Sequence, residues 1–355
     1  MHLGKIIMKC KKFSLAVLST LFVTSTLLSV QTDTETSPES DLYKINSEVV
    51  SAHAEFLYWA VRESNLDYAL RMNGPAWGPD ETFAQGSYKN AKFDWTPGLR
   101  VALSYFNAPK FWEMKAEYTW LDSHGSNSAH KPSETDEFLN GTWPQIFIDP
   151  MQKAQSNIHF NYNLAEFQAT RVFNPNPHLR MRLLGGLAGT WMNQDWNVKY
   201  FDSQENVTKT KNTWDYWGVG IQAGFSMDWY LDFAHMFLTG KATTGLFLGR
   251  YHNHALQRTT FNPDGLHNTS IPFRNAYYED TRIAYNIQVL LGPSWQKNTN
   301  AYRFEIFAGY EINAWFNVQE TFRSTGNAPD LPKETLINTG TLSLDGLTVR
   351  ATMDF

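Results

Sequence analysis

The chain has 355 residues and a formal net charge of −5 at neutral pH, a balance that gives no reason to expect a nucleic-acid partner. Aromatic residues make up 15% of the chain, including 13 Trp and 16 Tyr, and their rings are typical of the boundary between membrane and water. No internal stretch approaches the roughly 20 apolar residues that a membrane-spanning helix needs. A membrane protein built from helices is therefore excluded, but one built from strands is not.

The chain begins with the pattern of a signal peptide. Four lysines among residues 1–12 precede an apolar run at 13–30, and polar residues follow. This order is that of a secretory signal, whereas a membrane anchor is disfavoured because the run is short and rich in Ser and Thr. We expect a signal peptide at 1–30, a flexible periplasmic lead-in at 31–53 and one β-domain at 54–355.

From residue 54 onward, apolar side chains recur at every second position. The clearest run is 111–121, where Trp112, Met114, Ala116, Tyr118 and Trp120 share one face and Glu113, Lys115, Glu117 and Thr119 share the other. Such alternation predicts a strand with one apolar face. Similar runs occupy 54–62, 95–106, 158–172, 179–191, 214–229, 236–250, 281–292, 302–315 and 342–355. Within 158–172 the phase changes near Leu164, which suggests a β-bulge.

The connections between these runs alternate in length. Long connections lie at 63–94, 122–157, 192–213, 251–280 and 316–341, and short ones at 107–110, 173–178, 230–235 and 293–301. This alternation is typical of a barrel with both termini in the periplasm. We expect an all-β fold: a transmembrane, antiparallel, up-and-down β-barrel of about ten strands, with long extracellular loops and short periplasmic turns. About twelve strands would result if 64–72 or 317–323 formed separate strands.

The polar faces of the predicted strands carry many charges of both signs. These candidate pore-lining residues are Arg100, Glu113, Lys115, Glu117, Glu166, Arg180, Arg182, Asp228, Lys241, Arg303, Glu305, Glu311 and Arg350. They either line a wet passage or pair across a narrow lumen and plug it. Both remain possible for about ten strands, because a barrel of about eight strands has room only for side chains whereas one of 16–18 strands holds an open channel. The inward glycines Gly218, Gly220 and Gly224 relieve crowding and favour the passage slightly.

The last run ends on the terminal residue itself, Phe355. A terminal aromatic residue that closes an alternating strand resembles the assembly signal of bacterial outer-membrane proteins. We therefore expect the bacterial outer membrane as the location, with its lipid and the barrel-assembly machinery as partners. A homo-oligomer is left open.

Several strand segments together resemble a known family. They are 55–59 (EFLYW), 95–101 (WTPGLRV), 161–164 (NYNL), 185–188 (GGLA) and 344–350 (LDGLTVR). Over roughly residues 54–355, the chain is similar to the major-outer-membrane-protein-like, pore-forming family of Legionella and the environmental chlamydiae. The resemblance implies a pore for small solutes and supplies no catalytic residues. The only cysteine, Cys10, lies in the segment expected to be removed, so envelope cross-linking by disulfides is not implied.

Two further groups of residues offer weaker signals. His252 and His254, with His267 near them in sequence, could share a metal ion, although histidines in loops are more often solvated. Asp195, His254 and Asp280 fall in loop regions, where outer-membrane proteases of the barrel type use Asp and His. Neither signal outweighs its ordinary explanation, so we predict no metal, no cofactor and no enzyme.

The sequence thus predicts a porin-like channel for passive diffusion of small hydrophilic solutes or ions. The first alternative is a plugged structural or adhesin barrel that presents surface loops. The second, less favoured, is a hydrolase at the barrel rim.

Overall fold

The computed structural model describes residues 48–72, 86–107, 110–133, 137–143, 151–176, 178–231, 234–261, 269–299, 302–324, 334–338 and 341–355. The predicted signal peptide, most of the predicted lead-in and His267 lie outside these ranges. In the described part of the chain, no helix is long and apolar enough to span a membrane.

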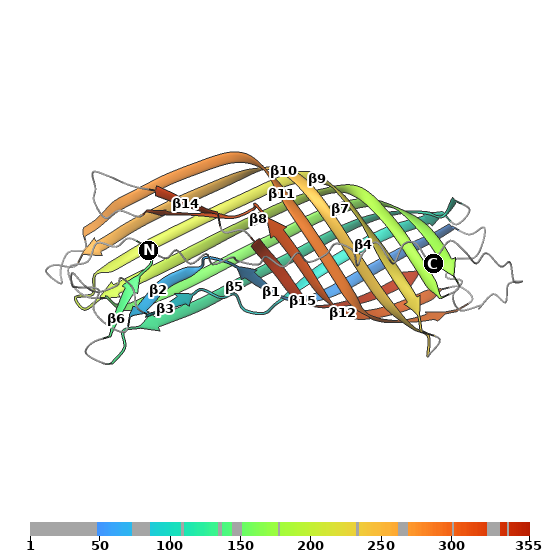
Figure 1. Ribbon diagram of the computed structural model, residues 1–355, viewed down its shortest axis with the longest axis horizontal. Helices are drawn as coiled ribbons and strands as arrows, with labels where there is room; N and C mark the ends of the chain where they lie inside the picture. The colour runs from blue at the N-terminus through green and yellow to red at the C-terminus, as the bar shows by residue number, and fades with distance from the viewer. Residues whose placement is uncertain are drawn as a thin grey trace, which may run out of the picture. The chain divides into compact units, whose positions relative to one another are not determined.

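Ten of the described strands form a closed antiparallel ring in chain order (Figure 1). They are β1 (Glu48–Glu63), β4 (Thr96–Asn107), β5 (Trp112–His130), β7 (Met151–Asn176), β8 (Leu179–Asp202), β9 (Val207–Tyr230), β10 (Met236–Phe261), β11 (Thr269–Asn298), β12 (Arg303–Phe316) and β15 (Thr341–Asp354). Pairing of β1 with β15 closes the ring, from Ser51 opposite Asp354 to Glu63 opposite Leu342. A closed ring leaves no edge whose backbone groups would lack partners in lipid. The predicted up-and-down β-barrel is confirmed.

Five short strands of the described residues lie outside the ring. β2 (Asp67–Met72) pairs with β3 (Gly86–Asn90) and β6 (Phe138–Gly141), and β6 meets β7 at the single pair Leu139 and Met151. β13 (Glu320–Ser324) and β14 (Glu334–Asn338) form a separate hairpin. The segments 64–72 and 317–323 therefore do contain strands, but these strands belong to long connections and do not enlarge the barrel.

The barrel strands run farther than the sequence predicted. β1 begins at Glu48, before the expected start at residue 54, and β8 and β9 extend until only residues 203–206 connect them. Alternation continues in these extensions with its polarity reversed. On β8, the outward Asn193 and Asp195 are polar, whereas the inward Met192 and Trp196 are buried and apolar. The barrel wall therefore continues past the lipid into water, where its outer face must be polar.

The expected β-bulge near Leu164 is wrong. Leu164 pairs in unbroken register with Thr119 of β5 and with Thr190 of β7's other neighbour, β8. Its side chain is buried inside the barrel. The apparent change of phase arises because Leu164 lies where the inner face changes from polar to apolar. Register shifts in β7 occur instead near its ends, at Met151/Lys153 and Phe173/Asn176.

Candidate channel lumen

The structure places all the predicted pore-lining residues on the inner side of the barrel. Arg100, Glu117, Glu166, Arg180, Asp228, Arg303, Glu305 and Glu311 are buried there, and Glu113, Lys115, Arg182, Lys241 and Arg350 line an inner cavity. The side chains between them in sequence, such as Trp112, Leu183 and Val349, point outward. Strand alternation alone thus indicated which of these side chains point inward.

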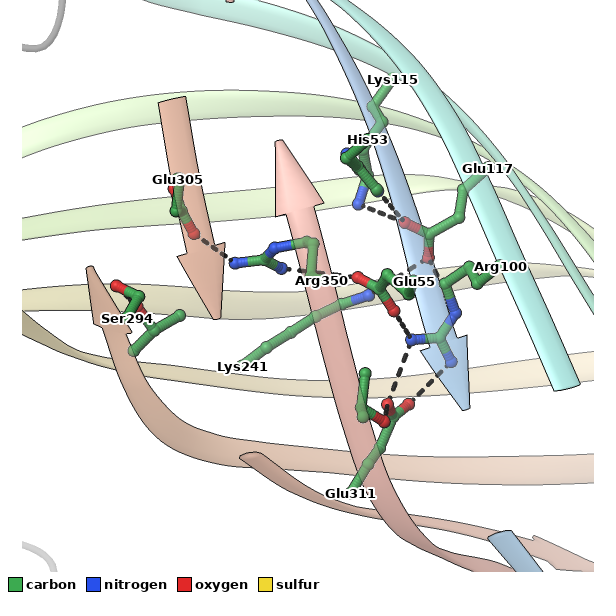
Figure 2. Close-up of polar contacts among 12 residues, drawn as sticks. His53, Glu55, Arg100, Lys115, Glu117, Lys241, Ser294, Glu305, Glu311 and Arg350 are labelled. Carbon is green, nitrogen blue, oxygen red and sulfur yellow. Dashed lines mark hydrogen bonds and ion pairs between the residues drawn. The ribbon is translucent and has the colours of Figure 1, made fainter. Parts of the chain in front are cut away.

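Arg100 of β4 is the centre of a layer of charges across the lumen (Figure 2). Its guanidinium donates to Glu55 Oε2 of β1 at 2.6 Å and to Glu311 Oε1 of β12 at 2.7 Å. Nε donates to Thr119 Oγ1 at 2.9 Å, and the guanidinium carbon lies 5.4 Å from the Trp59 ring centroid. A guanidinium offers several donors in one plane, so one arginine can bind two carboxylates from different strands.

Glu117 of β5 is surrounded by three further groups that can carry positive charge. Lys115 Nζ lies 2.8 Å from Oε2, His53 Nε2 lies 3.3 Å from Oε2, and Lys241 Nζ lies 3.6 Å from Oε1. Lys241 belongs to β10, which three strands separate from β5 around the shorter side of the ring. This last ion pair therefore crosses the lumen from one wall to the other, as Figure 2 shows for the side chains involved.

On the periplasmic side of this layer, charged pairs surround a polar cavity of about 110 Å³. Arg350 donates a hydrogen bond to Glu305 at 2.8 Å. Arg303 donates to the same carboxylate at 2.6 Å and also pairs with Asp354. Arg182 donates to Asp228 at 2.6 Å on the facing wall. Because five cationic and four anionic side chains line the cavity, both ion signs find partners there.

Sequence reasoning missed three members of this network: His53, Glu55 and Asp354. Glu55 lies in the run 54–62, which alternates weakly because Ala54 contributes little apolar signal beside Phe56 and Tyr58. His53 falls in the segment that was assigned to the lead-in, although β1 begins at Glu48. The sequence nevertheless allowed the prediction that His53 and Glu55 point inward, because they alternate with Phe56 and Tyr58. Asp354 likewise alternates with Phe355 and could have been found from the same pattern.

On the extracellular side of the charged layer, the lumen contains packed aromatic rings. Trp315 contacts Tyr162 and Phe247, with ring centroids 6.2 Å and 4.8 Å away. Trp59 Nε1 donates to Thr348 Oγ1 at 3.1 Å. These rings belong to one cluster of buried side chains that continues toward the extracellular end. In the described residues, packed rings therefore occupy the extracellular half of the lumen, whereas the periplasmic half keeps a polar cavity.

The inward glycine Gly218 makes room for a ring and does not widen a passage. A Cβ atom at Gly218 would lie 2.6 Å from the hydroxyl oxygen of Tyr216, and one at Gly249 would meet the same oxygen at 2.6 Å. Any side chain at these positions would displace the Tyr216 ring, which is itself buried. The slight preference for an open passage that the sequence drew from these glycines is therefore not supported.

Glu63 lies at the extracellular end of β1, past the outward ring of Tyr58 and beside the outward Arg62. Its Oε1 accepts a hydrogen bond from Gln194 Nε2 at 3.2 Å, whereas the buried Oε2 has no partner in the described part of the chain. Burial raises the pKa of the Glu63 carboxyl to about 8, because the charged form would lose hydration without gaining a cation.

The residues of the two weaker predicted sites do not converge. His252 pairs with Asp215 at 3.1 Å, and His254 bonds to Asn275 at 2.8 Å, both on the outer face. Asp280 binds Arg282 at 2.8 Å inside the barrel. Asp195 lies 3.5 Å from Lys211 on the outer face of other strands. Within the described ranges no group of three or more His, Cys, Asp or Glu could hold a metal ion.

Comparison with solved structures finds matches at low similarity. The outer membrane protease OmpT of Escherichia coli is 9% identical, with 89% of this chain and 99% of that chain covered and a TM-score of 0.41. A Pseudomonas aeruginosa FadL homologue is 10% identical, with 87% and 90% covered and a TM-score of 0.24. The P. putida toluene transporter TodX is 8% identical, with 89% and 91% covered and a TM-score of 0.26.

A search of curated protein sequences finds no match. A family model does match: that of the Legionella pneumophila major outer membrane protein precursor, over residues 47–355. The match spans every described strand of the barrel, and it confirms the resemblance found in the strand segments. The chain belongs to the Legionella major outer membrane protein family and is a β-barrel of the bacterial outer membrane.

Proposed function

We propose that the protein is a narrow channel for small hydrophilic solutes or ions, with a gate formed by the charged layer around Arg100. The observation that carries this proposal is the ion pair between Lys241 and Glu117, whose strands stand on opposite walls. A contact of this kind closes the lumen while it is formed. It opens a polar route through the charged layer if the two side chains exchange partners.

Partner exchange is favoured by the arrangement of charges. Arg100 faces the carboxylates of Glu55, Glu117 and Glu311, and Glu117 in turn faces Lys115 and Lys241. Arg100 and Glu117 can each release one partner and keep another, so that neither is left isolated during the exchange. An isolated buried ion would cost several kcal/mol.

The chemistry of the layer also argues against a purely structural role. Buried ion pairs can often be replaced by apolar side chains at no loss of stability, so a permanent plug does not require them. A polar lumen that admits water and ions does. The cavity of about 110 Å³ on the periplasmic side supplies a charged vestibule that leads to the gate.

A plugged structural barrel is the second candidate, and the aromatic cluster favours it. Trp59, Tyr162, Phe247 and Trp315 are buried in the extracellular half, and solutes would have to displace them or pass beside them. In this candidate the strand extensions and long connections present a surface, and the lumen carries nothing. We propose no catalytic activity for either candidate.

Single-channel recording in a planar bilayer tests the channel proposal. The refolded barrel should give small, discrete conductance steps, and Arg182→Glu in the vestibule should shift the selectivity toward cations. Arg62→Glu is the matched control, because Arg62 is an exposed arginine that pairs with Asp345 on the outer face. A silent membrane, with folding verified by altered gel mobility before and after boiling, would favour the plugged barrel.

A further inference from the structure

Two hollows lie one above the other on the outer face of β7, β8 and β9. The lower one, of about 720 Å³, lies within the apolar band that faces lipid. The upper one, of about 460 Å³, lies at the extracellular edge of that band. The three strands pair in unbroken register here, so their outward side chains form rows that run across the strands.

The lower hollow is apolar, and small residues form its floor. Ala165 pairs with Gly189, which pairs with Val219. A Cβ atom at Gly189 would meet no atom closer than Trp191 Cη2 at 3.5 Å, so a larger group fits above this glycine without a clash, beside the edge of the Trp191 ring. Phe167, Leu187 and Ile221 form the next row toward the periplasm, and all three are more than half exposed. The wall therefore contains a shallow apolar recess that large apolar side chains border on its periplasmic side.

The upper hollow joins indole rings to polar groups. Trp191 and Trp217 are direct cross-strand neighbours, and Asn163 completes their row. The row above consists of Asn161, Asn193 and Asp215. Asn163 Nδ2 donates to Asn161 Oδ1 at 2.6 Å, which holds the two amides in place. The Trp row marks the level at which lipid chains give way to headgroups.

The order of the rows along the strands, from the periplasmic toward the extracellular end, matches that of an amphiphile. An acyl chain fits the recess over Ala165 and Gly189, and its headgroup then lies against the indoles and the amide row. Amide and carboxylate groups hydrogen-bond to hydroxyl and amide groups, and indole faces pack against the C–H faces of sugar rings. The residues described as lining the upper hollow include no Lys or Arg, so the hollow favours a sugar over a bare phosphate.

A second copy of the barrel fits this recess less well than a lipid does. The outer wall of a barrel is convex, so another wall would bridge the recess and leave it empty. A single flexible chain can enter it. We propose that the outer face of β7–β9 is a binding site for a glycolipid of the outer leaflet, with an acyl chain over Gly189 and a sugar against Trp191 and Asn193. This proposal does not depend on the channel.

Native mass spectrometry of the detergent-solubilised barrel tests it, with dephosphorylated lipid A (an acylated glucosamine disaccharide without phosphates, called lipid A below) and phosphatidylglycerol as the two probes. Gly189→Leu fills the recess, and Asn193→Leu removes an amide from the polar row. Ala308→Leu is the matched control, because Ala308 is an exposed, outward small residue on β12. A difference in gel mobility between unboiled and boiled samples verifies that each variant is folded. Two variants are used so that the test still stands if one of them does not fold.

We expect one lipid A molecule to remain bound to the wild-type barrel and to Ala308→Leu. Its affinity for Gly189→Leu and for Asn193→Leu should be at least tenfold lower. Phosphatidylglycerol should bind no better to the wild type than to the two variants. Equal retention of lipid A by all four proteins would overturn the proposal. The proposal would also be overturned if phosphatidylglycerol displaced lipid A from the wild type as well as lipid A itself does. The same holds if Gly189→Leu abolished a dimer of the barrel and left lipid binding unchanged.

Discussion

Glu63 is a carboxyl group whose ionisation the fold opposes. Burial raises its pKa to about 8, whereas in an unfolded chain a glutamate titrates near about 4.3. Between these values the folded barrel binds more protons than the unfolded chain. The contribution of Glu63 to stability therefore becomes less favourable as the pH rises through this window. Below the window both states are protonated, and the penalty vanishes.

The variant Glu63→Gln should abolish this penalty. We expect it to unfold at a higher temperature than the wild type at pH 8 and at nearly the same temperature at pH 4. The difference should amount to at most about 1.4 kcal/mol for each pH unit in the window. Thermal loss of the fast-migrating folded band on gels measures it. Glu205→Gln, at an exposed glutamate, is the control, and identical pH profiles for the two variants would contradict the assignment.

At the scale of single residues, the sequence predicted which side of the wall a residue faces but not its partners. Lys241 and Glu117 are 124 positions apart by number, and nothing in their local sequence indicates that they meet across the lumen. The pair depends on how many strands close the ring and how they are staggered. Leu164 shows a different error. The strand alternates correctly there, but the inner face changes from polar to apolar, and this change was interpreted as a bulge.

At the scale of elements, the terminal strand combines a structural and a proposed assembly role. Phe355 and Val50 exchange two backbone hydrogen bonds, of 3.0 Å and 2.9 Å, which extend the seam between β1 and β15. The Phe355 ring itself is more than half exposed on the outer face. Backbone pairing therefore closes the seam, and the ring is left available for recognition during assembly.

Phe355→Ala should separate these two roles. Because the backbone bonds of the seam do not need the ring, we expect the variant to refold in detergent almost as well as the wild type. In bacterial cells, however, the amount of folded barrel in the outer membrane should fall several-fold. Quantifying the heat-modifiable band in membrane fractions measures this. Equal amounts of the two proteins in cells would argue against an assembly signal at Phe355.

The extents of the strands were the least predictable feature at this scale. The sequence search required apolar residues on the outer face, and that rule holds only within lipid. Past the Trp row on β8 and β9, the outer face is polar and the inner face apolar, so Asn193 and Lys211 were assigned to a loop although they lie in strands. A search for alternation of either polarity would have extended both strands.

At the scale of the whole molecule, the ring of ten described strands followed from the alternation of long and short connections. The filling of the lumen did not follow, because a barrel of this size lies between those that side chains fill and those that hold an open channel. Whether side chains fill the lumen or leave a channel depends on the packing of Trp315, Tyr162 and Phe247 above the charged layer. That packing brings together strands far apart in sequence.

The charge pair across the lumen tests the gate most directly. Single-channel conductance should be compared for the wild type, for Lys241→Glu and for Lys241→Glu combined with Glu117→Lys. We expect repulsion in the single variant to raise the conductance or the open probability several-fold. The double variant restores opposite charges and should return the recordings to those of the wild type. If all three folded proteins were silent, or conducted equally, the charged layer would not be a gate.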